Sequence, residues 1–239
     1  MPPASRAKRP PASNCRPEPA AVDGLAPGTE PAADCPICPR LAAYRRDNRA
    51  AEPGWHNAPV PAFGAAGARL LIVGLAPGRR GANRTGRPFT GDYAGLLLYP
   101  TLLGFGFAAG DYAERADDGL RPVDCRVTNA VRCAPPANKP TPPEIGHCRH
   151  YLKAEIAAMP RLRAVLALGA VAHASVVTAL GQRPARWKFA HGARHDLPGG
   201  PVVFDSYHCS RLNTNTGRLT EAMFRAVVGD LRGFLDQTP

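Results

Sequence analysis

Short apolar runs that alternate with stretches of helical spacing constrain the fold of this chain more than any other feature. The apolar runs cover residues 69–74, 123–131, 163–168 and 201–207, and the helical stretches cover residues 93–103, 142–159, 170–180 and 219–235. A buried strand followed by a helix leads back to a parallel neighbouring strand, so this order predicts an α/β fold whose mostly parallel sheet is covered on both faces. The clearest helix start is the capping box formed by Thr141 and Glu144, with proline at the first helical position. Residues 182–200 are expected to form an irregular or hairpin-like connection.

The longest glycine-rich loop, residues 74–92, directly follows the apolar residues 70–73 and ends in the carboxylate of Asp92. At the carboxyl end of a buried strand, backbone amides and cations face the crevice in which open α/β sheets bind ligands. The loop therefore predicts a ligand site. A nucleotide-binding enzyme that cradles phosphate with Gly74 and Gly78 is disfavoured, because no Gly-Lys-Ser/Thr follows and no acidic pair for a metal is apparent.

The charge of the chain indicates a polyanionic partner. The formal net charge is +11 at pH 7, and the first 30 residues hold four basic and three acidic side chains, so the basic excess belongs to the rest of the chain. Basic residues interspersed with glycine and polar residues favour a partner such as nucleic acid.

The first 30 residues are rich in Pro and Ala and show neither helical spacing nor an apolar run of signal-peptide length. We interpret residues 1–30 as a disordered tail and residues 31–239 as a single domain. The most apolar later stretch, residues 164–180, contains Gly169 and His173 and divides into a strand and a helix, which argues against a membrane span. Without an export signal, the chain is expected in the cytoplasm and not on a membrane.

Four of the seven cysteines could meet at one site. Cys35 and Cys38 form a C-x-x-C motif, and Cys133 and Cys148 form a second pair. Four thiolates so placed could hold structural zinc or a four-iron cluster, and their spacing does not separate these metals. In the alternative interpretation, the second pair are buried hydrophobic residues and the C-x-x-C is a redox pair. Cys125 lies within an apolar run and is expected in the core.

Polar residues that follow three of the predicted strands form the rest of the candidate site. Asp92 ends the first loop, Asn129 lies near the end of the second run, and His208 opens a polar loop, residues 207–218, after the fourth. Parallel strands bring their carboxyl ends to one edge, so these three side chains should lie close together. Each has a structural alternative: Asp92 as a helix N-cap, Asn129 as a tie for a loop and His208 as a satisfied structural residue.

Four ordered motifs point to a known family: Gly-Leu-Ala-Pro-Gly at 74–78, Arg-Pro-Phe-Thr-Gly-Asp at 87–92, Thr-Asn-Ala-Val-Arg-Cys at 128–133 and His-Cys-Ser-Arg-Leu-Asn at 208–213. Together they resemble the type-5 uracil-DNA glycosylases, which belong to the iron–sulfur branch of their superfamily. The resemblance covers residues 35–234. It implies a three-layer α/β/α sandwich, a [4Fe–4S] cluster on the four paired cysteines, and removal of uracil and other deaminated bases from DNA to leave an abasic site.

The resemblance also implies a role for each residue at the candidate site. Phe89 stacks on the flipped base, and Asn129 contacts its polar edge with one donor and one acceptor. His208 donates a hydrogen bond toward the carbonyl oxygen of the departing base, whose negative charge grows as the bond lengthens. Asp92 faces the sugar, where it stabilises cationic character or orients water. The rest of the base-binding set is Gly74, Ala76 and Gly78.

Basic residues of the first and last loops are expected to bind DNA phosphates. They are Arg79, Arg84, Arg87, Arg211 and Arg218. Such contacts predict salt-sensitive binding with little sequence preference, and the alternative is a solvated surface loop. Leu212 is the candidate wedge, because an inserted apolar side chain offsets part of the free energy of unstacking. The protein is expected to act as a monomer.

The chain departs at two positions from the superfamily that it resembles. Many relatives carry Glu, Asp or Gln where this chain has Leu75, so the water-orienting role is expected to move to Asp92. Cys209 takes the position of a proline that is common elsewhere, which leaves the rigidity of its loop open. A pocket without the polar group predicts broad specificity for uracil, hypoxanthine, xanthine and ethenocytosine. The remaining alternative is a non-catalytic DNA-binding protein in which an iron–sulfur or zinc site holds the fold together.

Overall fold

The computed structural model describes residues 28–237, so most of the predicted tail over residues 1–30 lies outside the described residues. Thr29 is buried and Glu30 pairs with two arginines, so these last two residues of the predicted tail belong to the folded part. The Glu30 carboxylate lies 3.3 Å from a guanidinium nitrogen of Arg126 and 3.1 Å from one of Arg132. The folded part thus begins before residue 31, and its interpretation as one domain stays a prediction.

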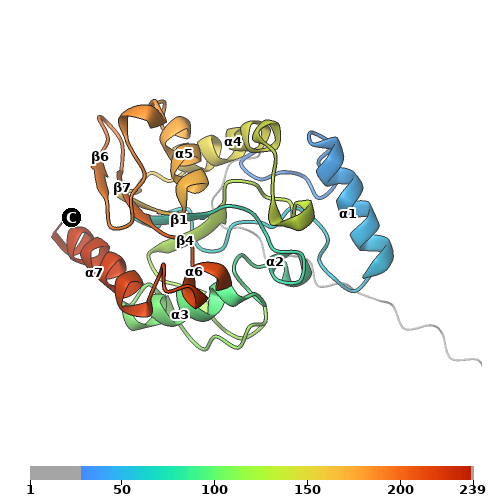
Figure 1. Ribbon diagram of the computed structural model, residues 1–239, viewed down its shortest axis with the longest axis horizontal. Helices are drawn as coiled ribbons and strands as arrows, with labels where there is room; N and C mark the ends of the chain where they lie inside the picture. The colour runs from blue at the N-terminus through green and yellow to red at the C-terminus, as the bar shows by residue number, and fades with distance from the viewer. Residues whose placement is uncertain (1–27, 238–239) are drawn as a thin grey trace, which may run out of the picture.

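The predicted strands form a five-stranded sheet (Figure 1). Its order is β4 (Cys125–Asn129), β1 (Leu70–Gly74), β5 (Ala164–Leu168), β7 (Val202–Ser206) and β6 (Arg194–Asp196). The four strands that the apolar runs predict pair in parallel, and β6 pairs antiparallel with β7. Every residue of β1, β4 and β5 is buried, as expected of parallel strands covered on both faces. The β6–β7 pair supplies the hairpin-like connection expected between residues 182 and 200.

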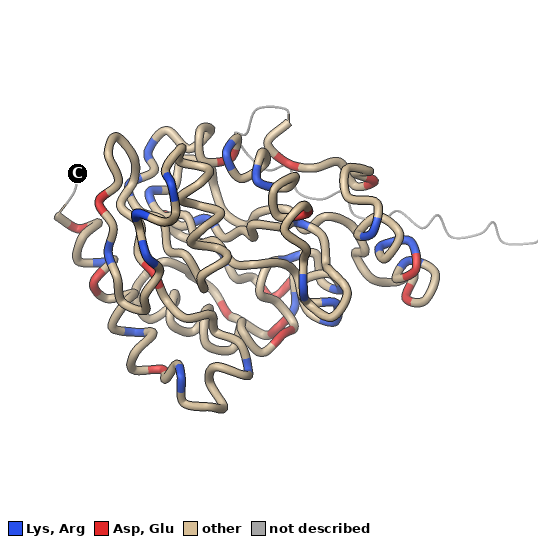
Figure 2. The backbone as a smooth tube through the Cα atoms, turned by 45° about the horizontal axis from the view of Figure 1, so that its top comes forward, with Lys and Arg blue, Asp and Glu red and all other residues tan. Residues whose placement is uncertain are grey.

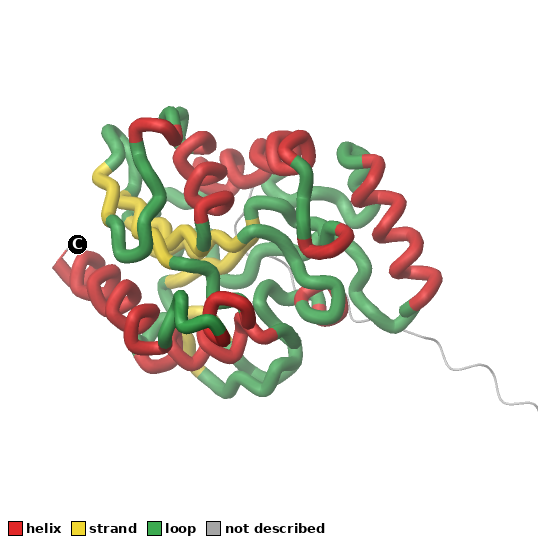
Figure 3. Tube along the Cα trace, viewed as in Figure 1, coloured by secondary structure: helices red, strands yellow, loops and turns green. Residues whose placement is uncertain are grey.

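Helices cover both faces of this sheet (Figures 1 and 3). The helices on one face are α3 (Tyr93–Gly104) and α7 (Glu221–Gln237), and those on the other are α4 (Pro142–Ala157) and α5 (Ala170–Ala179). Within β1, Leu70 and Ile72 join the core beneath α3 and α7, whereas Leu71 and Val73 join the core beneath α4 and α5. This alternation follows the two-residue period of strand side chains. The prediction of a three-layer α/β/α sandwich is confirmed.

The helix starts follow the local sequence closely. α3, α4 and α5 begin at the predicted residues, and α7 begins two residues later than predicted. At the start of α4, the backbone N–H of Thr141 donates to the Glu144 carboxylate at 2.7 Å, as the capping box predicts. In the part of the chain that the structure describes, no helix is long and apolar enough to cross a membrane.

Several shorter elements are not predicted by the sequence pattern. They are helices α1 (Pro39–Ala51), α2 (Ala82–Thr85) and α6 (Arg211–Asn215), strands β2 (Ala108–Ala109) and β3 (Arg121–Pro122), and 3₁₀ turns at Pro136–Asn138 and Pro184–Arg186. α1 starts directly after the C-x-x-C motif, with Cys38 as its N-cap. α6 lies in the segment expected to be a loop, where the Ser210 hydroxyl accepts the N–H of Asn213 at 3.4 Å.

Candidate active site

A cavity of about 500 Å³ opens where β1, β5 and β7 end. Its wall includes Ala76 and Gly78 after β1, Gly169 after β5 and His208 after β7. Asp92, which precedes α3, lies in the same wall. The prediction that Asp92 and His208 meet at one edge of the sheet is therefore confirmed.

Asp92 caps α3 and lines the cavity at the same time. Its carboxylate accepts the backbone N–H of Gly95 at 3.3 Å, so the helix-cap alternative describes part of its role. Burial raises the pKa of Asp92, and its backbone hydrogen bonds offset part of that rise. The carboxylate lies against Gly81, where an added Cβ would come within 2.5 Å of its oxygen. A partly desolvated carboxylate of this kind interacts strongly with any positive charge in the cavity.

Asn129 and Phe89 converge on Gly74, the last residue of β1. Asn129 pairs with Gly74 across the sheet, and a Cβ added to Gly74 would overlap both the Phe89 ring and the Asn129 side-chain oxygen. Both side chains are 4% exposed. The structure does not place these two residues in the wall of the large cavity. The Phe89 ring centre lies 5.9 Å from that of His208, which does line it, so the two groups are neighbours.

His208 is a neutral imidazole at physiological pH. Burial lowers its pKa to about 4, so the ring carries one N–H and no charge. Contacts within the protein fix the loop that holds His208, although this loop lacks the proline common in the superfamily. The Asn213 amide donates to the His208 carbonyl at 2.9 Å, and Cys209 is fully buried in the core. These contacts supply the rigidity that the sequence left open.

Phe89 has an unusual backbone conformation. Its φ is +52°, in the left-handed region. This conformation costs about 1–2 kcal/mol for a residue with a Cβ, so the surrounding structure must hold it in place. Observed strain of this kind is concentrated at functional sites.

Arg87 corrects one prediction of DNA binding. The guanidinium is 4% exposed and donates two hydrogen bonds of 2.7 Å to the carboxylate of Asp118. A buried, bidentate pair leaves no guanidinium face for a phosphate. Arg87 is therefore part of the interior, and its pairing with Asp118 disfavours the predicted contact with a phosphate.

The other predicted DNA-binding residues lie in the wall or on the surface. Arg211 lines the cavity and lies 5.3 Å from the Tyr93 ring centre, and Arg218 lies 4.5 Å from that of Tyr207. Arg84 is exposed. Leu212, on α6, is 72% exposed. Figure 2 shows lysine and arginine spread over many segments of the backbone.

Arg79 is committed to contacts within the protein. Its Nε donates to the side-chain oxygen of Asn48 on α1 at 2.6 Å, and the guanidinium lies 5.3 Å from the ring centre of Trp55. The side chain is half-buried, so its role at a phosphate stays a prediction.

The four cysteines predicted to meet do so. Cys35, Cys38, Cys133 and Cys148 line one small cavity between α1 and the start of α4. Leu41 of α1 packs there against Val131 and Cys148. The contact joins the first helix to the rest of the fold across about a hundred residues of sequence.

The cysteine site disfavours thiolates unless a cation compensates for them. Burial, with a smaller contribution from a neighbouring thiolate at Cys148, raises the pKa of Cys38 to about 11 and that of Cys133 to about 12. Polar groups nevertheless face the sulfurs. Arg45 donates to the Cys133 sulfur at 3.5 Å, and the backbone N–H of Arg132 donates to the Cys148 sulfur at 3.3 Å. Buried thiols with such donors fit a bound metal centre, which deprotonates its ligands.

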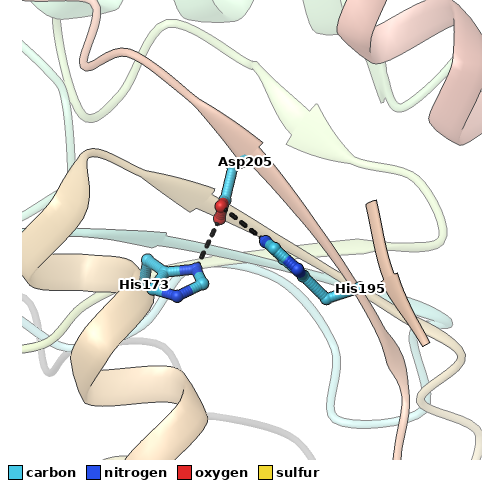
Figure 4. A group of neighbouring side chains, drawn as sticks. All are labelled: His173, His195 and Asp205. Atoms are coloured by element: carbon cyan, nitrogen blue, oxygen red, sulfur yellow. Dashed lines mark hydrogen bonds and ion pairs between the residues drawn. The ribbon is translucent and has the colours of Figure 1, made fainter. Parts of the chain in front are cut away.

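A second polar cluster lies away from these sites (Figure 4). The buried carboxylate of Asp205, on β7, lies 2.8 Å from Nδ1 of His173 and 2.9 Å from Nε2 of His195. Nε2 of His173 lies 2.6 Å from the carbonyl oxygen of Trp187. Both His173 nitrogens thus face acceptors, which requires the doubly protonated ring. The cluster joins α5, β6 and β7, and these hydrogen bonds account for it as a structural ion pair.

Sequence reasoning missed three residues near the site. Asp118 has no motif around it, and its partner is 31 residues away. Gly81 is one glycine among several in its loop, and its contact with Asp92 is visible only in three dimensions. Asn138 lines the cavity with φ of +56°. Its one sequence signal is that asparagine tolerates this conformation better than most residues.

Known proteins are similar to this chain in sequence. The family model described as the uracil DNA glycosylase superfamily matches residues 61–232. A type-5 uracil-DNA glycosylase of Thermus thermophilus is 46% identical over 200 residues, which cover 81% of this chain and 90% of the relative. One of Pyrobaculum aerophilum is 42% identical over 191 residues, or 78% of this chain and 83% of the relative. A type-4 enzyme of Thermotoga maritima is 34% identical over 148 residues, or 62% of this chain and 67% of the relative.

The family match covers the strands and helices that build the cavity, and the alignments cover 90% and 83% of the two type-5 relatives. The chain therefore belongs to the uracil DNA glycosylase superfamily and, within it, to the type-5 uracil-DNA glycosylases.

Proposed function

We propose that this protein hydrolyses the N-glycosidic bond of deaminated bases in DNA with Asp92, Asn129 and His208, and leaves an abasic site. The observation that carries the proposal is the single cavity whose wall holds a carboxylate and a neutral imidazole, next to the Phe89 and Asn129 side chains. A base inside a duplex is out of reach of these groups, so the enzyme must first extrude the nucleotide.

His208 stabilises the departing base. As the glycosidic bond lengthens, negative charge grows on the carbonyl oxygen of the base, and a donor aimed at that oxygen lowers the barrier. The pKa of about 4 keeps the ring neutral, so it donates a hydrogen bond without adding a charge to the ground state. A preorganised neutral donor in a buried site needs little rearrangement during the reaction.

Asp92 acts on the sugar side. The sugar becomes oxocarbenium-like as the base leaves, and a carboxylate stabilises this positive charge or orients the attacking water. Among the wall residues that the structure describes, Asp92 is the one carboxylate, and Leu75 supplies no polar group. Both facts support Asp92 as the residue that takes this role.

Phe89 and Asn129 recognise the base. The phenyl ring stacks on it, and the Asn129 carboxamide contacts its polar edge. Their position beside Gly74 supports this role, because a side chain at Gly74 would fill the space that both use. Ala76 and Gly78 in the cavity wall complete the binding set.

The apolar residue Leu75 in the cavity wall supports a broad range of bases, because no polar side chain at that position restricts the base. We propose hypoxanthine, xanthine and ethenocytosine as substrates beside uracil. DNA would enter past Arg211, with Leu212 as the wedge and Arg84 and Arg218 at phosphates.

A [4Fe–4S] cluster is the metal centre that we propose at the cysteine site. Four cysteines line this site, and four thiolates can hold either structural zinc or a [4Fe–4S] cluster. The motifs shared with the iron–sulfur branch of the superfamily favour the cluster. A bound cluster would supply a covalent link between α1 and α4.

The described residues also support a proposal for the oligomeric state and the cellular compartment. We propose that the protein acts as a monomer, since Asp92 and His208 of one chain line the same cavity. The free cysteines of the described part suit a reducing compartment, which supports the cytoplasm.

Base release from a labelled oligonucleotide tests the function. Anaerobically purified protein is incubated with DNA that contains one uracil or one hypoxanthine, and abasic sites are cleaved by alkali. We expect cleavage with about four irons per chain. Asp92→Asn should remove most turnover and leave DNA affinity unchanged or higher, whereas the matched exposed variant Asp196→Asn on β6 should behave as wild type.

Intact strands despite tight DNA binding and a full complement of iron would contradict the proposal. That result would favour a non-catalytic DNA-binding protein. Equal base release by Asp92→Asn and wild type would reject only the role of Asp92. A uracil activity thousands of times greater than that on every other base would reject the broad specificity.

A further inference from the structure

Four side chains surround the strained backbone of Phe89 and take no part in the proposed reaction. They form what we call the Phe89 clamp, which consists of the ion pair Arg87–Asp118 and the hydroxyl groups of Tyr99 and Tyr112. We propose that the Phe89 clamp positions the Phe89 ring for stacking on the extruded base. This inference rests on the stacking role proposed above for Phe89.

The two tyrosine hydroxyls hold the peptide groups on either side of Phe89. Tyr99 donates to the carbonyl oxygen of Pro88 at 2.5 Å, and Tyr112 donates to that of Phe89 at 3.2 Å. The φ and ψ angles of a residue describe how its two flanking peptide planes are rotated about the Cα atom. Two hydrogen bonds, one to each plane, therefore stabilise the left-handed conformation directly.

The ion pair holds the tyrosines in place. The Arg87 guanidinium lies 5.6 Å from the Tyr99 ring centre and 5.8 Å from that of Tyr112, and the two rings are 4.7 Å apart. Its Nε donates to the hydroxyl of Thr90, the residue after Phe89, at 2.7 Å. The guanidinium thus contacts both aromatic rings and the strained segment.

Asp118 anchors the guanidinium to another part of the chain. Its carboxylate accepts two hydrogen bonds from Arg87 and the backbone N–H groups of Ala113 and Leu120, at 2.9 and 3.1 Å. A carboxylate held by four donors is rigid and stays ionised. The segment before β3 therefore fixes the loop after β1 through one side chain.

Two glycines leave room for the clamped conformation. A Cβ on Gly95 would overlap the Phe89 carbonyl oxygen and the Tyr112 hydroxyl, and thus break their hydrogen bond. A Cβ on Gly74 would overlap the Phe89 ring at the other end. Both the hydrogen bond and the ring position therefore depend on space that the fold keeps free.

Without the clamp, Phe89 should relax to an ordinary φ and its ring should leave Asn129 and His208. The expected signature is weaker binding of the base, which raises KM and weakens inhibition by free uracil more than it lowers kcat. A purely structural role for these residues would lower the melting temperature without that split.

Tyr112→Phe and Asp118→Asn test the inference, each alone and combined with Phe89→Ala. We measure kcat and KM on uracil-containing DNA, the inhibition constant of free uracil, and melting temperature. Tyr112→Phe should lower kcat/KM about tenfold, as expected for one hydrogen bond. Asp118→Asn should lower it about a hundredfold, because the lost hydrogen bonds are charge-assisted. In the Phe89→Ala background, each change should be less than about twofold.

Asp124→Asn is the matched control. Like Asp118, Asp124 pairs with an arginine, Arg69, at 2.6 Å, but it lies at the opposite end of β4 from Asn129. This variant should keep the wild-type KM and uracil inhibition. If Asp118→Asn does not fold, Tyr112→Phe carries the test, because it removes a single oxygen from a half-buried side chain.

Two results would overturn the inference, and they are distinguishable. If Phe89→Ala alone keeps the wild-type kcat/KM, Phe89 does not recognise the base, and the proposed role and the inference both fail. If Phe89→Ala is impaired but the clamp variants lose as much activity in that background as in the wild type, the inference alone fails.

Discussion

Replacement of Asp205 by asparagine should destabilise the protein more at acidic than at alkaline pH. The Asp205 carboxylate is fully buried and accepts hydrogen bonds from His173 and His195 (Figure 4). Burial by itself lowers the pKa of His173, but the hydrogen bond and charge of Asp205 outweigh it and raise the pKa above its ordinary value. Asparagine keeps the shape of the side chain and removes the charge, so the variant isolates the electrostatic contribution of Asp205 to stability.

The size of the effect follows from the burial of the pair. Loss of one partner of a buried ion pair destabilises a protein by about 3–5 kcal/mol, because the other charge stays uncompensated. For a chain of this length, that corresponds to a fall in melting temperature of roughly 6–20 °C. A group whose pKa is raised by folding contributes its full stabilisation of the folded state at pH values below its unfolded pKa, which is about 6.5 for histidine. This stabilisation is lost as the pH rises through the folded pKa.

Denaturant unfolding at pH 6 and at pH 9.5 measures this dependence. The difference in unfolding free energy between wild type and Asp205→Asn should be largest at pH 6 and should shrink at pH 9.5. The exposed pair Arg194–Asp196 on the neighbouring strand gives the control, and Asp196→Asn should change stability by less than about 1 kcal/mol at either pH. An equal effect of Asp205→Asn at both pH values would refute the assignment of a charged His173.

Four further predictions concern the active site and the cysteines. Gly81→Ala should lower kcat/KM about a hundredfold, because the added Cβ displaces the Asp92 carboxylate, and single-turnover base release measures it. Since the pKa of His208 is about 4, the kcat profile between pH 5 and 8 should contain no His208 transition, which His208→Gln checks. Cys133→Ser should lose bound iron and lower the melting temperature, as seen by metal analysis and calorimetry. Arg211→Ala should reduce the slope of log affinity against log salt by about 1 in a DNA titration.

The sequence predicts those parts of the fold whose signal is local. The buried strands β1 and β5 are short apolar runs, and the Thr141 and Glu144 capping box predicts the start of α4. The grouping of the four cysteines is also predictable, because paired cysteines indicate a shared metal site even when the pairs are far apart in the sequence. The sequence pattern does not predict α1, because most of its side chains are polar and only a few positions, such as Leu41, pack on the cysteine site.

Arg87 shows where sequence reasoning about the site fails. An arginine in a glycine-rich loop of a basic protein resembles a phosphate ligand, and no residue near it in the sequence indicates a buried carboxylate partner. Its partner Asp118 belongs to a segment of little regular structure between β2 and β3. Burial of a charge depends on a partner far along the chain, and residue type alone cannot reveal it.

Two glycines of the first loop have a different use from the one that a glycine-rich loop suggests. A loop rich in glycine predicts backbone amides presented to a ligand, or a chain that needs positive φ angles. Gly86 and Gly91 do have a positive φ, but Gly74 and Gly81 do not, and a Cβ on either would overlap a side chain of the proposed active site. At Gly74 the overlapping groups are Phe89 and Asn129, and at Gly81 the group is Asp92. These glycines therefore make room for the side chains that are proposed to do the chemistry, and substitution at them should change catalysis before it changes affinity for DNA.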